Sequence, residues 1–79
     1  MLKEEIMKVF GGLYKRCDPP SAELNAKELA IILVEKRIAF DLEEMSIVLT
    51  ELVKEEKLGI KISVFLDEAF VHFKSTGKF

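Results

Sequence analysis

The side chains that could perform chemistry in this chain are few and lie far apart in the sequence. Its 79 residues include one cysteine, Cys17, and one histidine, His72. A nucleophilic cysteine needs a neighbouring base, and a catalytic or metal-binding histidine needs acidic or cysteine companions. Neither residue has such a companion at a suitable spacing, and Gly11-Gly12 lacks the Lys-Ser/Thr ending of a phosphate loop. We therefore expect no enzyme activity and no cofactor.

Composition and charge limit the domain organisation, the compartment and the class of partner that we expect. Hydrophobic residues make up 49% of the chain and charged residues 33%, which predicts a single folded domain over residues 1–79. The net charge of −2 disfavours nucleic acid as a partner and suits a basic peptide. No apolar run approaches the ~20 residues that span a bilayer, and the start MLKEE lacks a signal-peptide core. One cysteine allows no intrachain disulfide, so we expect a cytoplasmic protein without membrane contact.

Two helices are predicted in the first half of the chain. Residues 3–16 carry apolar side chains on one helical face. A connection that contains two prolines follows at residues 18–24, because proline removes backbone donors. Asn25 and Glu28 then have the spacing of a capping box, which predicts a helix over residues 26–36.

A third helix is predicted from Asp41, which has the side chain of an N-cap, to about residue 55. The residues expected on its buried face are Met45, Val48, Leu49 and Leu52. The residues that make the helix acidic are Glu43, Glu44, Glu51, Glu55 and Glu56. Such a helix would repel the phosphates of nucleic acid and could receive Lys or Arg from a protein target.

Residues 58–77 allow two structures. The favoured one is a short extended piece followed by a fourth helix that Ser63 caps. The apolar residues at helical spacing in it are Phe65, Leu66, Ala69, Phe70 and Phe73. The alternative is a β-hairpin with residues 70–74 as its second strand. The residues that alternate in its first strand are Ile60, Ile62 and Val64. Its turn, at residues 66–69, lacks the glycine or asparagine that tight hairpins prefer, so we favour the helix.

A weak internal repeat relates the two halves of the chain at a separation of 36 residues. The apolar residues in register are Ile6 with Leu42, Val9 with Met45, Leu13 with Leu49, Leu24 with Ile60, and Leu29 with Phe65. A helix, a short loop and a helix, given twice, resembles the EF-hand superfamily, especially one lobe of calmodulin or a myosin light chain. The resemblance implies an all-α fold, a four-helix paired lobe with hands at about residues 3–36 and 41–75. It also implies that Leu24 and Ile60 pair in two short loop strands.

The two loops of this resemblance lack most calcium ligands. Calcium takes about six to eight oxygen ligands at fixed positions of a loop. The second loop, residues 53–64, has lysines at two of those positions and Val64 in place of the terminal glutamate. The first loop, residues 17–28, retains only Glu28 as a strong ligand. We therefore expect no bound metal, with Glu28 as the residual candidate and the capping box as its preferred role.

The function implied by the resemblance is that of a calcium-independent adaptor or light chain. Its partner would be an amphipathic, basic helix, such as an IQ-like motif of an unconventional myosin, bound by a monomer of this chain. The residues that the resemblance places along the binding groove are Leu29, Ile32, Leu33, Met45, Val48, Leu49, Leu52, Phe65 and Ala69.

Two alternatives remain open. One is a calgranulin-like homodimer, and the residues that would form its interface are Ile6, Phe10, Phe70 and Phe73. The other is a winged helix that contacts protein or nucleic acid, although the acidic third helix argues against the latter partner.

Overall fold

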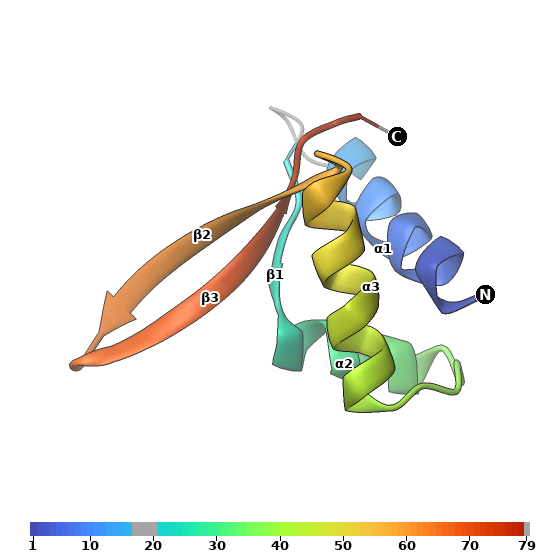
Figure 1. Ribbon diagram of the computed structural model, residues 1–79, viewed down its shortest axis with the longest axis horizontal. Coiled ribbons are helices and arrows are strands. Elements are labelled where there is room, and N and C mark those ends of the chain that lie inside the picture. The colour runs from blue at the N-terminus through green and yellow to red at the C-terminus, as the bar shows by residue number, and fades with distance from the viewer. Residues whose placement is uncertain (17–20, 79) are drawn as a thin grey trace.

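The computed structural model describes residues 1–16 and 21–78, and in these residues it contains three helices and one three-stranded antiparallel sheet (Figure 1). The elements in chain order are α1 (Leu2–Arg16), β1 (Glu23–Asn25), α2 (Ala26–Glu35), α3 (Leu42–Lys54), β2 (Leu58–Phe65) and β3 (Glu68–Ser75). The fold is mixed α/β. The prediction of an all-α, four-helix lobe was therefore wrong.

The three predicted helices are confirmed, and side-chain caps explain where α2 and α3 begin. Asn25 Oδ1 accepts the Glu28 N–H at 2.8 Å, and the Glu28 carboxylate accepts the Asn25 N–H at 3.2 Å, which completes the predicted capping box of α2. Asp41 Oδ1 accepts the Glu44 N–H at 2.7 Å at the start of α3. Each interaction lies within one turn of chain, so the sequence alone specifies it.

The core lies between the three helices and the inner side of the sheet. The predicted buried face of α3 is confirmed, since Met45, Val48, Leu49 and Leu52 are all buried. The largest fully buried side chains come from every helix and from β2, and they are Ile6, Phe10, Leu29, Leu33, Leu52 and Leu58. Leu58 is the first residue of β2, so that strand begins in the core and then leaves it.

The sheet has the strand order β1-β3-β2, with both neighbours antiparallel to β3. Phe73 of β3 pairs with Leu24 of β1 on one side and with Ile60 of β2 on the other. Leu24 and Ile60 therefore share a sheet, but they do not pair with each other as the paired-loop arrangement requires. Their common partner belongs to the segment that was predicted as the fourth helix.

Residues 58–75 form a β-hairpin, so the favoured fourth helix and its N-cap at Ser63 were wrong. The turn contains only Leu66 and Asp67, which have φ angles of 52° and 63°. Left-handed backbone costs roughly 1–2 kcal/mol for a residue with a side chain. The hairpin compensates for this cost because β3 pairs with two strands and its Phe73 packs against the core.

The two halves of the internal repeat fold differently. The first half is helix, strand and helix, whereas the second half is helix, strand and strand. Residues 58–64 of the predicted second calcium loop lie in β2. Residues 17–20 of the predicted first loop lie outside the described residues, and residues 23–28 contain β1 and the start of α2.

Candidate functional site

The outer part of the β2–β3 hairpin extends beyond the helices (Figure 1). Side chains alternate between the two faces of a strand, so residues in register with the buried Leu58 and the core-packed Phe73 share one face. We call the projecting hairpin the wing and this surface the inner wing face. Beyond the core the face comprises Ile60, Ile62, Val64, Ala69 and Val71. Ile62 is 64% exposed and Val64 is 71% exposed. The hairpin thus presents an apolar surface that no described residue covers.

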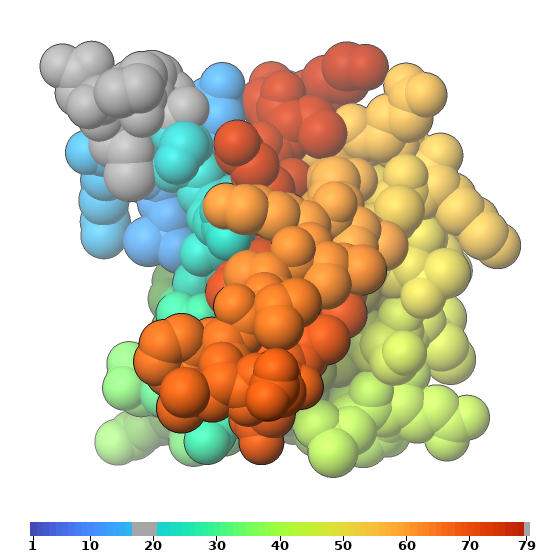
Figure 2. All heavy atoms as spheres, turned by 90° about the vertical axis from the view of Figure 1, so that its left-hand side faces the viewer, coloured from blue at the N-terminus to red at the C-terminus, as the bar shows by residue number. Residues whose placement is uncertain are grey.

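Figure 2 views the molecule from the side to which the hairpin projects, with α3 on one side of it. Between α3 and the sheet is a hollow of about 270 Å³, and the residues that line it are Ala26, Leu42, Met45, Ser46, Leu49, Thr50 and Phe73. None of these residues carries a charge. Phe73 pairs with Ile60, so the hollow adjoins the inner wing face.

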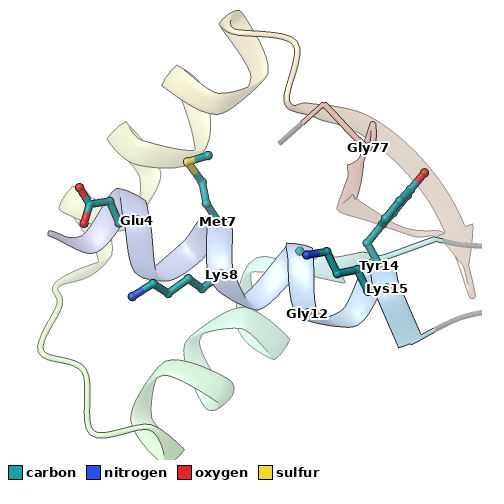
Figure 3. Close-up of a pocket in the computed structure, with 8 residues that line it drawn as sticks. Glu4, Met7, Lys8, Gly12, Tyr14, Lys15 and Gly77 are labelled. Carbon is teal, nitrogen blue, oxygen red and sulfur yellow. The ribbon is translucent and has the colours of Figure 1, made fainter.

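A second, larger hollow of about 650 Å³ lies along α1 and is open to solvent (Figure 3). Seven of its eight lining residues come from α1, and Gly11 and Gly12 form part of its floor. Tyr14 reaches toward Gly77 at one end (Figure 3). One helix supplies nearly all of its wall, whereas small-molecule sites are enclosed and have convergent polar groups. This hollow is therefore a weak candidate for a ligand site.

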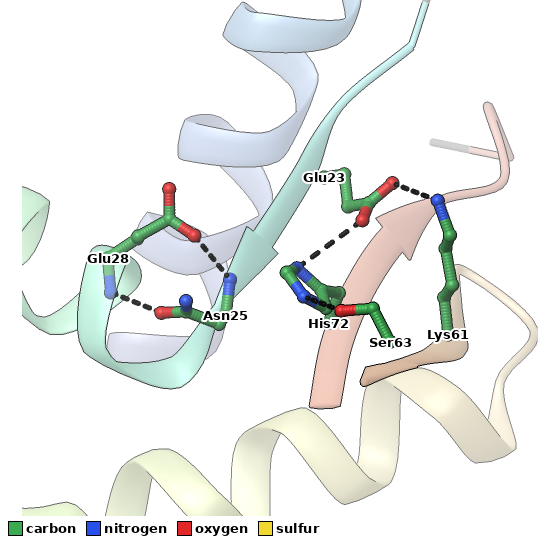
Figure 4. Close-up of polar contacts among 6 residues, drawn as sticks. All are labelled: Glu23, Asn25, Glu28, Lys61, Ser63 and His72. Atoms are coloured by element: carbon green, nitrogen blue, oxygen red, sulfur yellow. Dashed lines mark hydrogen bonds and ion pairs between the residues drawn. The ribbon is translucent and has the colours of Figure 1, made fainter. Parts of the chain in front are cut away.

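The outer face of the sheet carries a polar network (Figure 4). His72 Nδ1 lies 3.3 Å from Glu23 Oε1, and His72 Nε2 lies 2.9 Å from Ser63 Oγ. If Nδ1 donates to the carboxylate, Nε2 accepts the Ser63 hydroxyl proton. Lys61 Nζ lies 3.5 Å from the other Glu23 oxygen. Sequence reasoning missed this arrangement, because Glu23, Ser63 and His72 come together only through the register of three strands.

The order Ser, His and Glu is that of a hydrolytic triad, but the site lacks the other parts of such a centre. Acyl transfer needs donors directed at the developing oxyanion and a hollow for the substrate. Ser63 pairs with Phe70 in the middle of the β2–β3 ladder, and neither hollow described above includes Ser63 or His72. The contacts of the network link β1, β2 and β3 across the outer face of the sheet.

Metal binding has no support in the described part of the chain, where no group of three or more His, Cys, Asp or Glu side chains could hold an ion. Glu28, the residual candidate from the sequence, directs its carboxylate to the Asn25 N–H (Figure 4). Its observed contact is that of a capping residue.

The charges on α3 and on the hairpin are acidic or balanced. The first turn of α3 carries the acidic residues Glu43 and Glu44. Lys54 is the one basic residue of this helix. On the hairpin, two lysines are balanced by Asp67 and Glu68 at the tip. This surface has no excess of positive charge with which to contact phosphates.

The residues predicted to line a partner groove are divided between the core and the hairpin. Six of them are buried, and they are Leu29, Leu33, Met45, Val48, Leu49 and Leu52. Ile32 packs partly buried against that cluster. Phe65 and Ala69 lie on the hairpin near its turn, and both are exposed. Only Met45 and Leu49 also line the hollow beside α3.

The four residues proposed for a calgranulin-like interface are also separated. Ile6 and Phe10 are fully buried within the chain, whereas Phe70 is 38% exposed on the outer face of the hairpin. Phe73 is shared between the core and the hollow beside α3. These four side chains form no common exposed patch.

The described elements follow one another in the order helix, strand, helix, helix, strand, strand, and the β2–β3 hairpin lies beside the third helix. Comparison of the chain with protein-family models, curated proteins and solved structures gave no match. No helix in the described residues is long and apolar enough to cross a membrane.

Proposed function

We propose that this protein is a winged-helix module that binds another polypeptide through its wing. The observation that carries the proposal is the exposed inner wing face, which adjoins the uncharged hollow beside α3. Exposed apolar surface that is continuous in this way is typical of protein-interaction sites. The proposal keeps the prediction of a protein partner but assigns the contact to a different surface. The four-helix lobe on which the IQ-like adaptor prediction rested has no counterpart among the described residues.

Charge favours a polypeptide over nucleic acid as the partner. In a winged helix, α2 and α3 would form the helix-turn-helix pair, and the N-terminal residues of its second helix would approach base edges. Here α3 begins with the acidic Glu43 and Glu44, and Lys61 is already paired with Glu23. Binding to phosphates derives most of its free energy from unpaired Lys and Arg side chains. An apolar strand or helix face would instead bury the exposed parts of Ile62, Val64 and Val71, and each would gain a share of the roughly 1.5–3 kcal/mol that accompanies full burial of such a side chain.

Affinity purification with matched variants tests the proposal. Ile62→Lys adds a charge to the inner wing face, and Val34→Lys adds the same charge to α2 at a residue of nearly equal exposure, 66% against 64%. We expect the captured partner to be lost with Ile62→Lys and retained with Val34→Lys. Equal capture by both variants would overturn the proposal.

A titration with labelled duplex DNA at low salt tests nucleic acid, the class of partner that the charges disfavour. We expect no change in fluorescence anisotropy at micromolar protein. Saturable binding that weakens steeply as salt rises would show phosphate contacts and would contradict the proposal.

A further inference from the structure

Strand β2 forms an unprotected edge of the sheet. The strand order β1-β3-β2 leaves one side of β2 without a neighbour in the described residues. Its eight residues pair with β3 without interruption, so no bulge bends the edge away. The strand contains no proline and one charged residue, Lys61. Natural sheet edges are usually protected by charge, proline, bulges or a covering element, and β2 has little of this protection.

The register of the hairpin identifies which backbone groups are free. A two-residue turn closes the pair Phe65 and Glu68, which is a hydrogen-bonded pair in this kind of hairpin. Hydrogen-bonded and non-hydrogen-bonded pairs alternate along an antiparallel ladder. Ile60, Ile62 and Val64 therefore direct their N–H and C=O groups to the free edge. These residues also supply the apolar side chains of β2 on the inner wing face.

We propose that the occupant of this edge is the β2 strand of a second copy of this chain, paired antiparallel about Ile62. This inference rests on the proposed function, because it names the partner of the same surface. The two-fold axis sets Ile62 against Ile62 of the second copy and Ile60 against its Val64. The free backbone groups of one strand then face those of the other.

The charged side chains favour pairing about Ile62 over pairing about a nearby residue of the strand. Pairing about Ile62 sets Lys61 opposite the uncharged Ser63 of the second copy, and it brings Lys57 to the end of the strand beside the second copy's Asp67. Pairing about Lys61 would oppose two lysines directly, which is destabilising. Pairing about Ser63 or Ile60 would separate Lys57 from Asp67. In the described residues neither Lys57 nor Asp67 takes part in an ion pair.

The shape of the molecule leaves room for this pairing. The wing projects from the helices, so the outer part of β2 is clear of its own body (Figure 1). A two-fold axis perpendicular to the sheet places both inner wing faces on the same side of a continuous six-stranded sheet. The apolar side chains of the two β2 strands then become neighbours, which reduces their exposure to water.

Sedimentation of the purified chain across micromolar to millimolar concentration tests the pairing. We expect a dimer whose Kd rises about a hundredfold in Ile62→Lys, because two lysines become directly opposed and two isoleucines are lost. Val71→Lys is the matched control, since Val71 pairs with Ile62 on the same face but belongs to the central strand. We expect the dimer to persist in Val71→Lys. An equal rise of the dimer Kd in both variants would overturn edge pairing and would indicate contact through the inner wing face alone.

Cysteine cross-linking tests the register in a Cys17→Ser background. Ile62→Cys is expected to form a disulfide-linked dimer under mild oxidation, because residue 62 lies opposite itself at a distance that a disulfide spans. Ile60→Cys lies four residues from its equivalent along the paired strand, so we expect no cross-link. Cross-linking of Ile60→Cys alone would refute the proposed register.

The outcomes separate this inference from the proposed function. A chain that remains monomeric at all concentrations, while capture of another polypeptide still depends on Ile62, would refute self-pairing and leave the proposed function standing. A monomer whose capture of other proteins is indifferent to Ile62→Lys would refute both. Circular dichroism of each variant confirms that its fold is intact, as expected for substitutions at exposed residues.

Discussion

Leu24 of β1 and Ile60 of β2 lie on opposite sides of Phe73 in the central strand β3, and each is paired with it. These two residues occupy equivalent positions in the sequence repeat, but strand β3 separates them. The repeat therefore records a similar pattern of apolar residues and not a duplicated structure. The segment that separates the two residues, residues 68–75, is also the one whose secondary structure was predicted wrongly.

The turn of the wing offers the most direct test of the hairpin. Leu66 and Asp67 both have positive φ, where asparagine and glycine are preferred. We expect Leu66→Asn combined with Asp67→Gly to raise the free energy of unfolding by about 1 kcal/mol, because left-handed strain is relieved at both residues. Urea denaturation measures the change.

The same pair of substitutions distinguishes the two structures predicted for this segment. In a fourth helix, Asn and Gly would each reduce stability through their low helix propensity. A fall in the urea midpoint would therefore contradict the described turn.

The helix that faces the wing has one buried side and one exposed side, which predicts opposite results for two substitutions. Leu52 is fully buried, so Leu52→Ala should cost about 2–5 kcal/mol. Ile47 is 54% exposed, and Ile47→Ala should change the free energy of unfolding by no more than about 0.5 kcal/mol. Thermal or chemical denaturation of the two variants measures the difference, and similar losses would contradict the described orientation of α3.

The ion pairs between α1 and α3 predict a dependence of stability on pH. The side-chain hydrogen bond from Lys3 lowers the pKa of the Glu55 carboxyl below its usual 4.5, and the same bond raises the pKa of Lys3 above 10.5. Lys3 also lies 3.5 Å from Glu51. A lowered carboxyl pKa contributes stability that is present above pH 4.5 and is lost as pH falls through the folded-state pKa.

The dependence of stability on pH has the opposite sign for the ammonium group of Lys3. Its raised pKa contributes stability that is present below pH 10.5 and is lost as pH rises through the folded-state value. We therefore expect Lys3→Met to be less stable than the unsubstituted chain at neutral pH. The difference should shrink below pH 4.5 and above pH 10.5, as measured by denaturation across the pH range. A difference that does not change with pH would assign the effect to packing and not to charge.

The network on the outer face of the sheet predicts a structural effect and no catalysis. His72→Ala removes the contacts to Glu23 and Ser63, so it should lower the free energy of unfolding by about 1 kcal/mol. Lys74→Ala, two residues along the same strand and on the same face, is the control and should have a smaller effect.

Hydrolysis of an activated ester should be no faster with the unsubstituted chain than with His72→Ala. A rate that falls in both His72→Ala and Ser63→Ala would contradict a purely structural role for the network.

The three helices could be predicted because their signals are local. Apolar spacing placed the buried face of α3, and Asn25 and Asp41 marked the first turns of α2 and α3. A cap bonds only to residues within the next turn, so no other part of the chain is needed to interpret it. The acidic charge of α3 is likewise a property of the sequence alone, and it argues against nucleic acid as a partner.

Residues 58–75 could not be assigned from local signals, because the spacing of their apolar residues fits both a strand and a helix. Ile60, Ile62 and Val64 alternate as in a strand, whereas the phenylalanines that follow recur as in a helix. The turn lacks glycine, which favoured the helix in the prediction. In the folded chain, strand pairing outweighs this local preference. Pairing of β3 with both β1 and β2 satisfies the backbone along its length, and that interaction joins residues far apart in the chain.

The sequence by itself thus determined the helices, their caps, the buried face of α3 and the acidic character of its surface, because these depend on neighbours within a turn. Only the tertiary structure decided that the C-terminal segment is a wing, that Glu23, Ser63 and His72 meet, and that Ile62 and Val64 are exposed. Strand pairing brings together residues that lie far apart in the sequence, and a shift of one residue in register would exchange the two faces of the wing.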